Sequence, residues 1–344
     1  MTLITTSLTT SPIMTHPDVL PVILSFADRQ TLSRCMQVSW KFFNFASPYL
    51  YSNIRLIPNE ADAFLYGASF GPIIMEDGSE RDLKRELLAM VKVLNIEKHQ
   101  GCNGFLATAC SRWRGLGIEF PSLNVLRVWM GPNMFEGGWF NCPWIPNMSP
   151  QKLVMRNVTA ISAGNSYTFA PRDLLRKVQK VVVVVPKLRN LSEINQDALR
   201  SHRRTSESPI EPGTETVIVF WTEGPDSGWW AEAPLADYDN IIDQLVMCSL
   251  AEADRLTICN AGSIYPVVSE NGDCVAYVSY QEREGEVAAA VKRKIEQISR
   301  RRGELARLGK RLESLRFMSF GEYLGKEDWK GEFDPEEMAP WVLS

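Results

Sequence analysis

The chain has 344 residues and a formal net charge of −4; 45% of its residues are hydrophobic and 23% are charged. This length exceeds the size at which a single hydrophobic core usually stops growing, so we expect two domains of unequal size. The composition excludes an intrinsically disordered chain, and the small negative charge provides no overall basic surface for nucleic acid or an anionic membrane.

Three short helices are predicted near the start of the chain, after a Thr/Ser-rich tail (residues 1–13) that we expect to be disordered. The first runs over residues 19–27, and Asp28 is the predicted N-cap of the second. The third covers residues 40–46 and is expected to end before Pro48. Together these segments predict a small helical domain over residues 14–57.

Helices alternate with short apolar strands in the remainder of the chain, residues 58–344, which is typical of an α/β architecture. The run of five valines at 181–185 has no polar alternation, as in a strand covered on both faces within a parallel sheet. The predicted strands are 125–130, 153–158, 180–185, 216–221, 255–259 and 315–320.

Apolar residues at helical spacing predict three amphipathic helices between these strands. The three sets are Leu83, Leu87, Val91 and Leu94; then Ile241, Ile242, Leu245 and Val246; and, in one long helix, Val291, Ile295, Ile298, Leu305 and Leu312. The long helix carries a basic run at 292–311. We interpret this run as a solvated helix face, with a nuclear-import signal or an RNA contact as the alternatives.

Two of the predicted strands end in the same pattern, Leu-x-apolar-x-Asn-apolar. It reads LVMRNV at 153–158 and LTICNA at 256–261. In a leucine-rich solenoid the alternate apolar residues point into the core, and the Asn side chain satisfies backbone groups where the strand ends. The spacing between strands is irregular, unlike the about 20 to 29 residues of a regular repeat. An ordinary α/β domain with two chance matches is therefore the alternative.

No constellation of catalytic residues is evident in the sequence. The three histidines, His16, His99 and His202, are far apart, and no phosphate-binding loop is complete. We therefore expect a protein that is not an enzyme and has no catalytic, metal or cofactor site. The adjacent Trp229 and Trp230 lie in a Pro/Gly-flanked segment and are candidate partner-binding residues, although such rings more often pack on their own domain.

Cysteine usage and the N-terminal residues bear on the compartment. Seven cysteines are scattered without a Cys-x-x-Cys pair, which favours reduced, mostly buried thiols. The first residues lack the basic region of a secretory signal, and no apolar run reaches the roughly 18 residues of a membrane span. We expect a soluble protein of the cytoplasm, the nucleus or both.

The stretch PDVLPVILSFADRQTLSRCMQVSWKFFNFASPYLY, residues 17–51, resembles the F-box of fungal proteins. The matching features are Pro17, Leu20, Ile23-Leu24-Ser25-Phe26, Leu32, Val38-Ser39, Phe42, Phe43 and Ala46. The resemblance implies that this unit docks on a Skp-type adaptor, and through it on a cullin scaffold of a ubiquitin ligase, while the remaining residues capture a protein target.

The sequence thus predicts an F-box-like three-helix unit followed by an irregular leucine-rich-repeat-like α/β domain. Its expected role is that of a substrate-recognition adaptor, with neither nucleic acid nor membrane as a partner. The alternative is a structural or assembly protein that uses the same helices internally and joins no ligase. The resemblance assigns adaptor binding to Pro17, Leu20, Ile23, Leu24, Leu32, Val38, Phe42 and Phe43.

Overall fold

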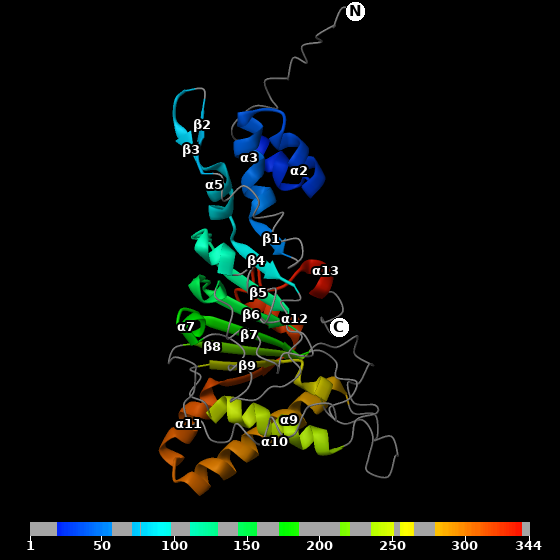
Figure 1. Ribbon diagram of the computed structural model, residues 1–344. Helices are drawn as coiled ribbons and strands as arrows, with labels where there is room; N and C mark the ends of the chain where they lie inside the picture. The colour runs from blue at the N-terminus through cyan, green and yellow to red at the C-terminus, as the bar shows by residue number, and fades with distance from the viewer. Residues whose placement is uncertain are drawn as a thin grey trace, which may run out of the picture.

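The computed structural model describes residues 19–56, 71–75, 77–97, 111–129, 144–156, 172–185, 214–220, 235–250, 255–264 and 279–338. Three helices, a parallel sheet and a second group of helices follow one another along the molecule (Figure 1). The helices at the first end are α1 (Val19–Ser25), α2 (Arg29–Met36) and α3 (Trp40–Tyr51).

The described residues form a main sheet of eight strands, all parallel, and the order of these strands in space is their order in the chain. The prediction of an α/β chain with a parallel sheet is confirmed. The strands are β1 (Asn53–Leu56), β4 (Val93–Ile96), β5 (Val125–Trp129), β6 (Lys152–Arg156), β7 (Lys180–Val185), β8 (Glu215–Phe220), β9 (Arg255–Cys259) and β10 (Leu315–Met318). Between β1 and β4 lies a small antiparallel hairpin of β2 (Ile73–Ile74) and β3 (Glu80–Arg81).

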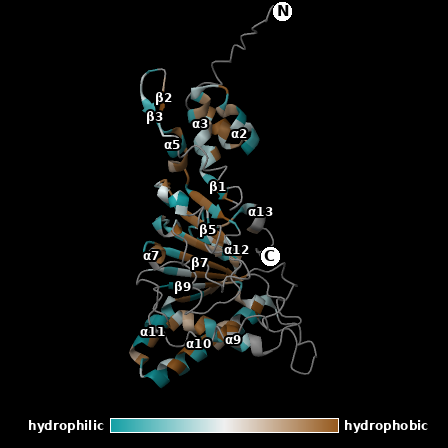
Figure 2. Cartoon of the chain, in the orientation of Figure 1, coloured by the Kyte–Doolittle hydropathy of each residue, from teal (hydrophilic) through white to brown (hydrophobic). Residues whose placement is uncertain are grey.

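Strand β7 shows why the sheet must be covered on both sides. All six of its residues are buried. Side chains alternate between faces along a strand, and accordingly Val181, Val183 and Val185 join one hydrophobic core while Val182 and Val184 join another. Figure 2 shows hydrophobic residues along these central strands. The expectation that the five-valine run is covered on both faces is confirmed.

The first core covers what we call the helix face of the sheet. The apolar residues of α9 predicted from their spacing, Ile241 to Val246, all contribute to it, as do Val291 and Ile295 of α10. The elements beside this face and at the far end of the molecule are α5 (Leu83–Ala89), η3 (Ile145–Asn147), α7 (Arg172–Leu175), α9 (Leu235–Leu250), η6 (Ala261–Ile264), α10 (Tyr280–Arg302) and α11 (Leu305–Ser314).

The second core covers the opposite face, which we call the strap face. After β10 the chain crosses the sheet through α12 (Phe320–Lys326) and ends its described part in α13 (Pro335–Met338). We call residues 319–338 the strap. Its apolar side chains pack against valines of β5 to β8, and the strap members of this core are Phe320, Tyr323, Phe333 and Met338.

Three local predictions are wrong. Pro48 lies inside α3, which continues to Tyr51. Leu94 belongs to β4, because α5 ends at Ala89 and the chain turns into the sheet. The predicted long helix is broken after Arg302, since Gly303 adopts a left-handed conformation with φ 70° and caps α10. A left-handed residue of this kind is a common helix terminator because glycine adopts it without steric cost.

Asn260 does what the strand-end pattern predicts. It follows β9, is buried, and adopts φ 58°, in the left-handed region that Asn tolerates better than most residues. Its Nδ2 donates to the Phe220 carbonyl at 3.3 Å, and its Oδ1 accepts from the Phe320 amide at 2.9 Å. One side chain therefore links β8, β9 and the start of α12. Asn157, the partner in that pattern, lies outside the described residues.

Candidate functional site

The three N-terminal helices enclose a small hydrophobic core of their own. Its buried members are Leu20, Leu24, Leu32 and Ala46, and none of them belongs to either core of the sheet. The start of α2 is fixed by Asp28, whose carboxylate accepts the Thr31 amide at 2.7 Å. That hydrogen bond lowers the pKa of Asp28, as is usual for an N-cap carboxylate.

Large apolar side chains also lie on the outside of this helical unit. Phe26 is 86% exposed and Val38 is 67% exposed. The other exposed apolar residues of the unit are Val19, Val22, Ile23, Trp40 and Tyr49. Isolated exposed apolar residues are ordinary, whereas several on a unit of this size are unusual for a surface that meets only water. We call Val22, Ile23, Phe26, Val38 and Trp40 the exposed apolar set.

The residues assigned to adaptor binding from the sequence divide into groups. Ile23 and Val38 lie on the surface. Leu20, Leu24 and Leu32 are buried among the three helices and form part of the interior of the unit. Phe42 and Phe43 are half-buried, and Phe42 packs against the helical core. Pro17 lies outside the described residues. Exposed Phe26 and Trp40 were not among the assigned residues, although Phe26 is part of the quoted motif.

The helical unit joins the sheet without an intervening linker, because α3 ends at Tyr51 and β1 begins at Asn53. The carbonyl of Ser52 accepts the amides of Lys92 and Val93, each at 2.9 Å, at the first position of the sheet ladder. A guanidinium nitrogen of Arg29 on α2 donates to the Asn53 carbonyl at 3.0 Å. These bonds fix the direction in which the unit leaves the sheet.

The strap face carries basic side chains where the opposite face carries apolar ones. Lys152 and Lys180 occupy neighbouring positions in the β6–β7 ladder. Both ammonium groups contact Oε1 of Glu332 on the strap, Lys152 at 3.2 Å and Lys180 at 2.8 Å. The Tyr323 hydroxyl donates to Oε2 of Glu332 at 2.5 Å. Glu332 is 0% exposed, so these partners take the place of water around its carboxylate.

Further ion pairs continue the row on either side of Glu332. On β5, Nη1 of Arg127 lies 2.7 Å from Oδ1 of Asp334. Lys152 also donates to Oδ2 of Asp328 at 3.1 Å, and that bond lowers the pKa of the Asp328 carboxyl. Burial, with a smaller contribution from Glu332, raises the pKa of Tyr323, so this phenol stays protonated and remains a donor. The strap face is thus a row of cations matched to carboxylates of the strap.

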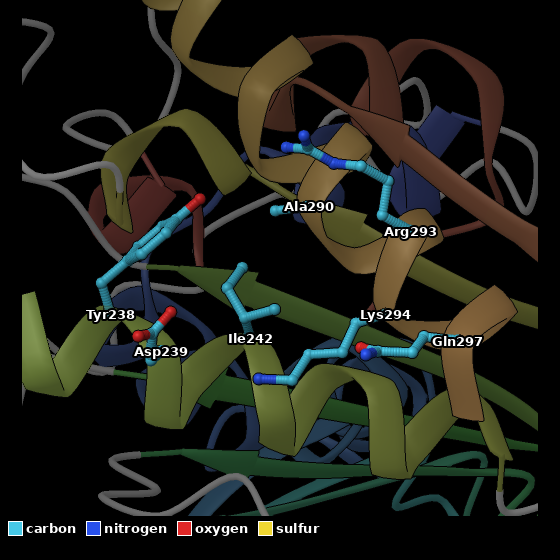
Figure 3. A pocket seen from close by; sticks show the side chains of 7 residues that line it. All are labelled: Tyr238, Asp239, Ile242, Ala290, Arg293, Lys294 and Gln297. Carbon is cyan, nitrogen blue, oxygen red and sulfur yellow. The ribbon is translucent and has the colours of Figure 1, made fainter. Parts of the chain in front are cut away.

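A surface cleft of about 400 Å³ lies between α9 and α10 (Figure 3). Lys294 extends from α10 towards α9, where its ammonium lies 2.5 Å from Oδ1 of Asp243. The residues that line the cleft are Tyr238, Asp239, Ile242, Ala290, Arg293, Lys294 and Gln297. This lining mixes charges of both signs with apolar carbons and contains no pair of nucleophile and base. It gives no reason to assign chemistry to the cleft.

The basic run at 292–311 is divided between α10 and α11. Lys292, Arg301 and Lys310 are exposed to solvent, while Arg311 pairs with Glu304 at 2.7 Å. The three arginines at 300–302 occupy the last turn of α10, where cations interact favourably with the helix dipole. The run is therefore mainly a solvated face, as the sequence predicts.

Neither thiols nor metal ligands form a reactive cluster in the described ranges. Cys35, Cys248 and Cys259 are unbridged there. Burial raises the pKa of the Cys248 thiol to about 12 and that of Cys259 well above its usual value, so both thiols remain protonated and unreactive. No group of His, Cys, Asp or Glu suited to a metal ion occurs among the described residues.

Trp229 and Trp230 lie outside the described residues. Within the described part of the chain, no helix combines the length and apolarity needed to cross a membrane. Comparison with protein-family models, with curated proteins and with solved structures gives no match for this chain.

Proposed function

We propose that this protein is a substrate-recognition adaptor of an SCF-type ubiquitin ligase. In this proposal the helical unit docks on a Skp-type adaptor, which connects it to a cullin scaffold, and the sheet domain binds a protein target. The observation that carries the proposal is the exposed apolar set, none of whose members belongs to the core of the helical unit in the described residues. The F-box resemblance of residues 17–51 supplies the identity of the partner.

The energetics are compatible with a docking surface. Burying one large apolar side chain contributes roughly 1.5 to 3 kcal/mol. Val22, Ile23, Phe26 and Val38 together would then contribute about 6 to 12 kcal/mol, against an association cost of about 4 to 15 kcal/mol. These four residues provide an apolar core for an interface, and polar contacts around them must supply the remaining binding free energy.

The sheet domain supports the second half of the proposal. Parallel strands whose spatial order is their chain order are what an irregular leucine-rich-repeat-like coil produces, since each repeat stacks on the one before it. Asn260 at the end of β9 makes the backbone contacts expected of the Asn in such a repeat. Such coils commonly present extended surfaces to protein partners.

The test is co-purification of the full chain with a Skp-type adaptor. Wild type should be retained, and the double variant Phe26→Asp/Val38→Asp should lose retention because two carboxylates would enter a desolvated contact. Leu305→Asp is the matched control, since Leu305 is exposed on α11 at the opposite end of the molecule. Absence of the wild-type complex beside a functioning F-box protein would exclude the proposal.

One observation favours the alternative, a structural or assembly protein that joins no ligase. Helix α3 runs directly into β1, and Ser52 is bonded to the strand beside it, so the helices are continuous with the sheet. This alternative requires that a chain lacking residues 1–57 be insoluble. The adaptor proposal expects that truncated chain to be soluble and to have lost only adaptor binding.

A further inference from the structure

The outer half of the strap, residues 327–338, is attached to the sheet by side chains. Its described backbone hydrogen bonds run within the segment, such as the Glu332 amide to the Trp329 carbonyl at 2.8 Å, or back to α12, where the Glu327 amide donates to the Tyr323 carbonyl at 2.9 Å, and none of them reaches the sheet. The bonds to the sheet come from basic side chains: Arg127 Nε donates to the Gly331 carbonyl at 2.6 Å, and Lys152 Nζ to the Asp328 carbonyl. In the described residues, the segment joins no strand of the sheet, so its departure would break no strand pairing.

Water reaches both edges of this attachment. The Asp328 side chain is 75% exposed and that of Asp334 is 41% exposed, although their cationic partners on the sheet are buried. Ion pairs with an exposed member contribute little free energy compared with buried apolar contacts. The buried contacts of the segment are made by Glu332 and Phe333 at its centre and by Met338 at its end. Glu327 at its start pairs with Arg255 of β9 at 2.5 Å.

The inner half of the strap is held differently. The Phe320 amide donates to Asn260, and Phe320 and Tyr323 are fully buried against the valines of the sheet. Ser319 and Glu322 form a capping box that defines the start of α12. Helix α12 is thus held by a backbone amide as well as by buried side chains, whereas the described hydrogen bonds between residues 327–338 and the sheet come from side chains of the sheet.

The centre of the outer half has the chemistry of a bound peptide. The Glu332 carboxylate lies between two ammonium groups and a phenol, and the adjacent Phe333 ring packs edge-on against Phe320, with ring centroids 5.0 Å apart. Two residues beyond Glu332, Asp334 pairs with Arg127 on the next strand. The sheet and α12 therefore contact a carboxylate, an aromatic ring and a second carboxylate in this order along the segment.

We propose that the strap face is a binding site for an acidic peptide segment with this alternation, and that residues 327–338 occupy it as an internal ligand. The inference rests on the proposed function, because it names the target class of the sheet domain: a protein that presents such a segment and displaces the outer strap. Because the strap is tethered, it competes at an effective concentration in the millimolar range, so the target must bind more tightly than the strap does.

The first test is amide hydrogen exchange on the wild-type chain, which needs no variant. The amides of residues 327–338 should exchange at least tenfold faster than those of β7, because the segment opens without global unfolding. Exchange at the same rate as β7 would make the strap a permanent part of the core and would overturn the inference.

The second test is binding of a fluorescein-labelled peptide with the sequence of residues 327–338, EDWKGEFDPEEM, to the full chain. The strap variant Glu332→Gln/Asp334→Asn should bind it at least tenfold more tightly than wild type, since its own strap competes less well. Adding Arg127→Gln should remove that gain. Glu313→Gln, at an exposed position on α11, is the matched control and should leave binding at the wild-type level.

The same peptide with both of those carboxylates replaced by amides should not bind. A folded strap variant that binds the peptide no better than wild type would contradict the inference. If that variant does not fold, the hydrogen-exchange rates of residues 327–338 in the wild-type chain decide between a strap that opens and one that stays in the core. Adaptor retention is measured separately. A failed peptide assay beside a retained adaptor overturns only this inference, whereas lost adaptor binding overturns the proposed function and leaves the peptide site unaffected.

Discussion

The two faces of the parallel sheet are covered in different ways. On the helix face, α9 and α10 contribute mainly aliphatic side chains such as Val291 and Ile295. On the strap face, the covering segment adds a buried carboxylate, Glu332, to its aromatic rings, and the sheet supplies Lys152 and Lys180. Replacing one aliphatic side chain by another of similar volume costs little stability. Removing one partner of a buried charge is strongly destabilising, because the remaining charge is left without compensation. The strap face should therefore respond to single charges, pH and salt.

The largest effect is expected for Glu332→Ala on the strap face. The substitution removes the counter-charge of Lys180 and leaves Lys152 with the largely exposed Asp328. Removing one side of a buried ion pair typically costs about 3 to 5 kcal/mol. Urea unfolding should show a loss of this size in the free energy of unfolding. Exposed Glu313→Gln on α11 should show almost none. A loss below about 1 kcal/mol would mean that water enters and solvates the lysines.

Ile295→Ala tests the helix face. Ile295 is fully buried, and truncating a buried isoleucine to alanine costs about 2 to 5 kcal/mol through lost transfer free energy and the cavity left behind. Because no charge is involved, the loss measured by urea unfolding should be the same at 0.1 and about 1 M salt. A loss that depends strongly on salt would show that the two faces are energetically coupled.

Gly331→Ala tests how closely the strap backbone approaches the sheet. Gly331 has φ 81°, and an added Cβ would lie 2.9 Å from Cγ2 of Val93 and 3.1 Å from Cγ2 of Val125. The left-handed conformation alone costs a residue with a Cβ about 1 to 2 kcal/mol. The free energy of unfolding should fall by that amount or more, and exchange of the amides around Gly331 should accelerate. Gly325→Ala, with open space around it, is the control.

The smallest effect is expected for Glu284→Gln, and it is stabilising. Burial, with a contribution from Glu322, raises the pKa of Glu284 to about 7 from a usual value of 4.5. An acid with a raised folded-state pKa destabilises the protein fully above that pKa, and the cost fades as the pH falls towards its unfolded value.

Since Glu284 is only half-buried, we expect a gain of about 1 kcal/mol at pH 8 for this variant, shrinking below pH 7 and absent near pH 4. The control is Glu286→Gln, at an exposed position on the same helix. Thermal unfolding across this pH range measures both variants. A gain that is constant with pH would exclude titration of Glu284 as its source.

Much of the sheet could be predicted from local sequence. All six predicted strands are present and agree within two residues at each end, because long apolar runs such as 181–185 leave little choice. β10 ends two residues early, where Ser319 caps α12. β1 and β4 were missed because they have four residues each, and Leu94 continues the helical spacing of Leu87 and Val91. Here burial in the sheet overrides a local helical pattern.

The candidate sites were less accessible to sequence reasoning. The F-box-like motif located the helical unit, but which of its residues are buried depends on how the three helices pack, and Leu24 and Phe26 illustrate the two outcomes within one motif. The strap contacts join residues about two hundred positions apart, as in Arg127 and Asp334. No local pattern encodes such a pairing. An available signal was the row of Lys and Arg interrupting otherwise apolar strands, since a charge in a buried strand requires a partner.

The order of the strands has a consequence for how this chain is made. Each new strand pairs with the one synthesised before it, so the sheet can grow in step with translation from β1 to β10. The strap follows every strand of the described residues, and within them the valines of β5 to β8 on its side are covered by residues 319–338, which leave the ribosome last. Before they emerge the nascent sheet exposes an apolar face, which is the kind of surface that chaperones bind and that drives aggregation. In terms of the described residues, a chain that ended before residue 319 would lack the segment that covers these valines.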